Sequence, residues 1–140
     1  MISSVGTSDE KLLCGKCLCG TTRYLVEDQF RYSLNCHCSN CRRATGGAFK
    51  PFAGIERGRF RITDGTDRLL IFGDGSEHDA HCGNCGSLLY SLVRDATYVH
   101  VTLGTLVDPP TIRPTAHIFV GSKAPWFTIT DDLPQYAELP

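Results

Sequence analysis

The distribution of cysteine residues limits the possible folds of this chain more than any other feature of its sequence. Its eight cysteines lie in CGKCLCG, CHCSNC and CGNCG, which hold Cys14, Cys17 and Cys19, then Cys36, Cys38 and Cys41, then Cys82 and Cys85. The first residues, MISSVGTSDEKLL, lack the basic and apolar regions of an export signal. We therefore expect a cytoplasmic, reducing location, where closely spaced cysteines bind metal more often than they form disulfides.

Length and composition predict one ordinary globular domain. The chain has 140 residues, of which 41% are hydrophobic and 21% charged. We expect a polar and partly frayed N-terminal segment over residues 1–13 and a single zinc-binding domain over 14–140. No apolar run is long enough to cross a membrane. The net charge of -1 argues against a nucleic-acid binder.

Short runs of β-branched and aromatic residues, separated by Gly, Asp and Pro, predict a mainly β domain of antiparallel strands with very little helix. One helical turn is expected at 40–45, capped by Ser39 and stopped by Gly46 and Gly47. A second capped turn is expected at 130–134. The predicted strands cover 21–26, 49–55, 59–63, 68–72, 87–93, 98–103 and 115–120.

Two close cysteine pairs have the spacing of a closed, structural zinc site with four ligands. Cys82 and Cys85 form a knuckle with Gly86 behind it, and Cys17 and Cys19 form a tighter one with Gly20 behind it. Glycine helps such turns close because it tolerates positive φ. One alternative remains for the N-terminal ligands: Cys14 and Cys17 have the commoner CxxC spacing and could replace Cys17 and Cys19. Buried free thiols are the other alternative.

The middle group supplies three thiolates within six residues, and no fourth cysteine belongs to it by spacing. Three protein ligands and one open position characterise a catalytic zinc site. The alternative is a second structural site completed by Cys14 or a histidine. His37 is a poor candidate, because a side chain in an extended segment points away from those of both neighbours. Arg42 and Arg43 follow directly and are candidates for binding an anionic ligand, with a solvated surface as the alternative.

The sequence resembles the glutathione-dependent formaldehyde-activating enzyme family, whose domain centromere protein V shares. The resemblance rests on GKCLCGTTRYLV, CHCSNCRRATGGAF, HCGNCGSLLY, HIFVGSKAPWF and DDLPQY, which occur here in the family's order. It implies a β-tent fold with two zinc ions per chain. The structural ion would be held by Cys17, Cys19, Cys82 and Cys85, and a labile ion by Cys36, Cys38 and Cys41. Cys14 lies outside the usual motif.

The resemblance also implies carbon–sulfur lyase chemistry on glutathione, or a similar thiol, and a small aldehyde such as formaldehyde. In this hypothesis Cys36, Cys38 and Cys41 form the catalytic site, while Arg42, Arg43 and Trp126 contact the substrate. The alternative is a non-enzymatic, zinc-stapled binding or scaffold module, as the centromere relative suggests. That class would be favoured by a basic, disordered extension, which we do not find in this sequence.

Overall fold

The computed structural model describes residues 11–140 and confirms the predicted mainly β architecture. The described part contains ten strands, one short α-helix, α1 (Ser39–Thr45), and four 3₁₀ turns. The strands are β1 (Leu12–Lys16), β2 (Arg23–Glu27), β3 (Tyr32–Cys36), β4 (Lys50–Glu56), β5 (Phe60–Asp64), β6 (Leu69–Gly73), β7 (His78–Cys82), β8 (Leu88–Val93), β9 (Tyr98–Thr102) and β10 (His117–Ile118). No helix among these residues is long and apolar enough to span a membrane.

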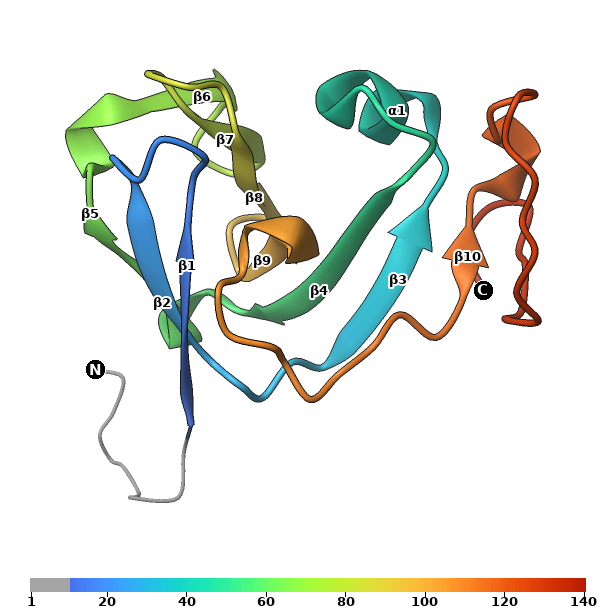
Figure 1. The fold of residues 1–140 in the computed structure, drawn as a ribbon, viewed down its shortest axis with the longest axis horizontal. Helices are drawn as coiled ribbons and strands as arrows, with labels where there is room; N and C mark the ends of the chain where they lie inside the picture. Colours follow the sequence, from blue (N-terminus) through green and yellow to red (C-terminus); the bar gives the residue numbers. More distant parts are fainter. Residues whose placement is uncertain (1–10) are drawn as a thin grey trace.

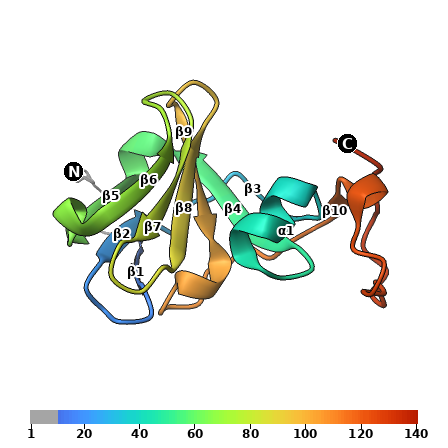
Figure 2. The ribbon, with the colours of Figure 1, turned by 90° about the horizontal axis from the view of Figure 1, so that it is seen from above.

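The strands form two sheets. A three-stranded sheet has the order β1-β2-β5, and a seven-stranded sheet has the order β10-β3-β4-β9-β8-β7-β6. All pairs are antiparallel, as predicted, except the two-residue pairing of β10 with β3. Figure 1 shows the small sheet packed beside the β6–β9 end of the large sheet, while α1 and the C-terminal segment lie at the opposite end. The view from above in Figure 2 separates these two ends clearly.

The predicted strands from 21–26 to 98–103 all occur, with ends shifted by at most two residues. The last prediction, 115–120, shrinks to the two residues of β10, because Val120 begins a 3₁₀ turn. Three strands were not predicted: β1, β3 and β7. Each has few β-branched residues and contains Cys, Gly, Asn or His, so its local strand propensity is weak. Pairing with neighbouring strands therefore determines that these segments become strands.

The N-terminal boundary also lies earlier than expected. β1 begins at Leu12, and Leu13 is fully buried, so the folded domain includes residues assigned above to a frayed segment. Residues 1–10, the rest of that predicted segment, lie outside the described part. The main core joins the two sheets through side chains such as Leu13, Tyr24, Ile55 and Val101. Burial of such side chains stabilises each by roughly 1.5–3 kcal/mol.

The short helix α1 ends as predicted and begins differently. Gly46 adopts φ 73, and its N–H donates to the Arg42 carbonyl. The N-cap is Cys38, whose sulfur accepts from the Cys41 N–H at 3.2 Å, and not Ser39. The capped helical turn expected at 130–134 does not form. Asp131 there accepts from the Leu133 N–H at 3.0 Å instead.

Candidate metal centres and the adjoining cleft

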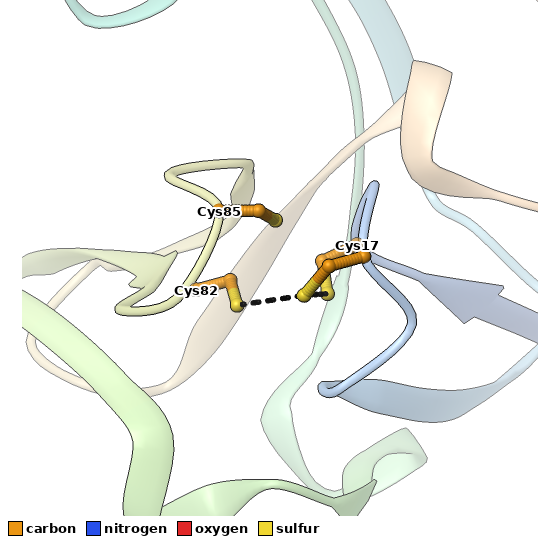
Figure 3. Close-up of side chains that lie close together, drawn as sticks. Cys17, Cys82 and Cys85 are labelled. Carbon is orange, nitrogen blue, oxygen red and sulfur yellow. Dashed lines mark hydrogen bonds between the residues drawn. The ribbon is translucent and has the colours of Figure 1, made fainter.

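Four cysteines from two distant turns meet in a compact cluster. Cys17 and Cys19 lie in the turn after β1, Cys82 ends β7, and Cys85 follows in the turn before β8. Their four sulfur atoms lie within 4.8 Å of one another. Figure 3 shows the labelled side chains of Cys17, Cys82 and Cys85 converging from the two turns. Gly20 and Gly86 have positive φ values of 80° and 86°, the conformation that we expected glycine to allow in these tight turns.

The spacing of the sulfur atoms suits a tetrahedral metal. Cys19 Sγ lies 3.6 Å from Cys17 Sγ and 3.8 Å from Cys82 Sγ. Four sulfurs at bond lengths of about 2.3 Å around zinc stand about 3.8 Å apart in a regular tetrahedron. Backbone N–H groups also point at the sulfurs, with Thr22 N 3.3 Å from Cys17 Sγ and Asn84 N 3.4 Å from Cys82 Sγ. These donors stabilise thiolates, so the cluster fits a closed zinc site.

Hydrogen bonding favours ionisation of the two more exposed thiols in this cluster. The Thr21 hydroxyl, 3.2 Å from Cys19 Sγ, lowers the pKa of Cys19 to about 7. The Ser87 hydroxyl lies 3.3 Å from Cys85 Sγ and lowers that pKa to about 5. Burial raises the pKa of Cys17. A metal ion would offset that cost, because it binds the thiolate form.

Cys14 lies apart from this cluster. It is exposed on β1, its N–H donates to Asp108 at 2.8 Å, and its carbonyl accepts from Val107. The rival pairing of Cys14 with Cys17 therefore has no support in the positions of the side chains. Cys14 is exposed whereas Cys17 is buried, and Cys14 is not among the four clustered sulfurs.

The trio of Cys36, Cys38 and Cys41 forms a second cluster. Its sulfur atoms also lie within 4.8 Å of one another. Cys36 ends β3, Cys38 caps α1, and Cys41 lies in the first turn of the helix, so the beginning of α1 folds the three thiols together. A hydrogen bond from Cys41 lowers the pKa of Cys36 to about 6, and the same bond together with burial raises the pKa of Cys41. The trio supplies three thiol ligands and no fourth protein ligand among the described residues.

His37 points away from the trio, as its extended backbone predicts. The side chain is fully buried, and its Nε2 lies 2.8 Å from Nδ1 of His117. His117 Nε2 in turn lies 3.0 Å from Asp131. Burial and the neighbouring His117 lower the pKa of His37 to about 4. This chain of side chains ties the C-terminal segment to the strand end beside the trio, and His37 is not among the residues that cluster with the three thiols.

A cleft of about 780 Å³ opens beside the trio, between α1 and the β6–β9 end of the large sheet. Asn40, Cys41, Arg43 and Ala44 line it from the helix, and Lys50, Phe72, Asp79, His81, Ser91, Val93 and His100 line it from the sheet. A volume of this size accommodates a tripeptide-sized ligand. Cys41 therefore connects the thiol cluster to a space that a substrate can enter.

A buried lysine gives the cleft a fixed positive charge. Lys50, at the start of β4, is 5% exposed, and its Nζ donates to the Ser91 hydroxyl at 2.6 Å. Ser91 donates to Asp79 at 2.6 Å. A buried charge requires partners, and this network gives Lys50 one hydrogen bond and, through Ser91, a link to the Asp79 carboxylate. Burial lowers the pKa of His100 to about 3, so that cleft residue is neutral at pH 7.

The predicted substrate-contact residues occupy different places. Arg43 lines the cleft, whereas Arg42 donates to the Ser122 carbonyl at 3.2 Å and ties α1 to the C-terminal segment. Trp126 is 69% exposed and is absent from the described lining of the cleft. Sequence reasoning missed Lys50, Asp79 and Ser91. They come from three strands, so no spacing in the sequence could have grouped them.

The fold and the two thiol clusters define a mainly β protein with two groups of cysteines able to hold metal ions. Residues 12–122 match the family model of the glutathione-dependent formaldehyde-activating enzyme, and the chain belongs to that family. A search of curated proteins found no match. Among solved structures, a crystal structure of a Rhodobacter sphaeroides protein is similar in fold, with a TM-score of 0.59 and 24% identity over 71% of this chain and 92% of that one.

Proposed function

We propose that the protein is a zinc-dependent carbon–sulfur lyase that joins glutathione, or a similar thiol, to a small aldehyde and reverses that reaction. The observation that carries the proposal is the position of Cys41, which belongs to a three-thiol cluster and also lines a cleft with two cations. Family membership supports the same chemistry. A zinc ion held by Cys36, Cys38 and Cys41 would lower the pKa of an incoming thiol.

The residues of the cleft have separate roles in this reaction. The Arg43 guanidinium binds a carboxylate of the thiol substrate and directs its sulfur toward the cluster. The substrate thiolate attacks the carbonyl carbon, a C–S bond forms, and the π electron pair of the C=O bond moves to oxygen. Lys50, held by Ser91, stabilises the charge on that oxygen until it takes a proton from water. The reverse reaction follows the same steps backward.

Exchange spectroscopy by NMR tests this function. Formaldehyde labelled with ¹³C interconverts with its glutathione adduct without a catalyst, and the wild-type, zinc-loaded protein should accelerate that exchange. Lys50→Met should reduce the acceleration by about 10²–10³-fold, because it removes a buried charge that acts on the developing oxyanion. Lys16→Met, at an exposed lysine of β1, is the matched control and should keep full acceleration. A wild-type protein that leaves the exchange rate unchanged would disprove the proposal.

The two adjacent arginines provide a second test with a built-in control. Arg43→Ala should weaken glutathione binding by about 1–3 kcal/mol, because a charge-assisted hydrogen bond to a carboxylate is lost. Arg42→Ala should change the affinity much less, since its side chain bonds to Ser122. Calorimetric titration of both variants measures the difference. A larger loss in Arg42→Ala would mean that Arg42, and not Arg43, binds the ligand.

A further inference from the structure

The strand β6 carries an exposed run of apolar side chains at the edge of the large sheet. Within residues 11–140 it pairs only with β7, at the end of the sheet opposite β10 (Figure 1). Leu70, Ile71 and Phe72 are 61%, 43% and 77% exposed. Natural proteins protect edge strands with charges, proline or bulges, and the segment LLIFG has none of these. Such an edge is suited to pair with another strand.

Hydrogen bonds at both ends of β6 show which of its backbone groups point toward β7 and which point to the open edge. Gly83 N donates to the Arg68 carbonyl at 2.7 Å, and Asp74 N donates to the Glu77 carbonyl at 2.9 Å. Hydrogen-bonding groups alternate between inward and outward along an antiparallel ladder. The even-numbered residues therefore bond toward β7, and the N–H and C=O groups of Leu69 and Ile71 point to the open edge.

We propose that two copies of this chain pair through β6, antiparallel, about a two-fold axis at Ile71. In this register Ile71 of each copy lies opposite Ile71 of the other, with their outward N–H and C=O groups facing. Leu70 of one copy lies opposite Phe72 of the second, and Arg68 lies opposite Asp74. The strand is thus complementary to itself in hydrogen bonding, in apolar contact and in charge.

Other registers are less favourable. An axis at Leu69 would place Asp67 opposite Ile71, and an axis at Gly73 would place Asp74 opposite Phe72, so each would set a carboxylate against an apolar side chain. An axis at Leu70 would place Arg68 opposite Phe72, and an axis at Phe72 would place Asp74 opposite Leu70, so each would set a charge against an apolar side chain. Registers shifted by an odd number of residues would place outward groups opposite residues whose own groups bond to β7. The register at Ile71 is the one that satisfies backbone, apolar and charged groups together.

Pairing through β6 also bears on the cleft. Phe72 lines the cleft and is mostly exposed in the single chain. In the proposed dimer, Leu70 of the second copy lies opposite Phe72 and covers part of its ring. The second copy therefore extends the apolar wall of the site and narrows its opening to solvent.

Sedimentation velocity of the full chain over a concentration series tests the dimer. Wild-type protein should reach the mass of a dimer. Ile71→Lys places two ammonium groups across the axis and should raise the dimer dissociation constant at least about tenfold. Leu12→Lys is the matched control, because Leu12 is a strand residue of similar exposure, 42%, on the other sheet. It should dimerise like the wild type, and the melting of both variants checks that they fold.

Hydrogen exchange locates the contact. The Ile71 amide should become protected as concentration rises, while the Leu70 amide, bonded toward β7, should be protected at every concentration. A wild-type chain that stays monomeric overturns the proposal, and so does a dimer that Ile71→Lys leaves intact. Protection of the Ile71 amide in a monomer would also overturn it, since the edge would then be covered without a second copy.

Discussion

Cys82→Ser and Cys19→Ser proteins should accumulate as unfolded or aggregated chains. The cluster they disrupt joins segments 63 residues apart, and Cys82 and Cys17 belong to the main core. A structural zinc site contributes about 10–16 kcal/mol in zinc-finger peptides. A whole domain has a net stability of only about 5–15 kcal/mol. Weakening this one site therefore removes a free energy comparable to the total stability of the fold.

The measurement is soluble yield, zinc content and thermal melting of each purified variant. Cys14→Ser is the matched control, because Cys14 is exposed and lies outside the cluster. It should melt cooperatively and keep the zinc content of the wild type. If Cys19→Ser keeps full zinc and a cooperative transition while Cys14→Ser does not, the N-terminal ligands are Cys14 and Cys17.

Cys38→Ser should abolish catalysis and leave the protein folded. Loss of even an outer-shell partner of a metal ligand reduces affinity or activity by about 10–100-fold, so loss of a ligand should cost more than about a hundredfold. The fold should persist for two reasons. The trio lies within six residues and closes only a short loop, and a serine at this position still caps α1.

The exchange rate measures catalysis, and circular dichroism with thermal melting measures folding. Proton release on glutathione binding adds an independent readout, because an incoming thiol binds metal as a thiolate. That release should disappear in Cys38→Ser. A variant that unfolds like Cys82→Ser would identify the trio as a second structural site. The scaffold function would then become the better hypothesis.

The sequence by itself determined the class of fold and the candidate ligands. Runs of β-branched and aromatic residues between turn residues located seven of the ten described strands, because both signals are local. The cysteine spacing separated a paired group from a trio for the same reason, since one tight turn brings two thiols together. It left open whether Cys14 or Cys19 accompanies Cys17, a choice that depends on which side of the backbone each side chain lies.

Only the tertiary structure decided what surrounds the trio. Lys50 binds Ser91 and Ser91 binds Asp79 because β4, β7 and β8 lie in one sheet, although Lys50 and Ser91 are 41 positions apart in the sequence. Arg42 and Arg43 are adjacent in sequence, yet helical geometry turns successive side chains by about 100°, so one contacts the C-terminal segment and the other the cleft. Strands such as β3 and β7 have weak local propensity and form because neighbouring strands supply their hydrogen bonds. Contacts between distant segments have no fixed spacing in the chain, and for that reason the sequence alone could not reveal them.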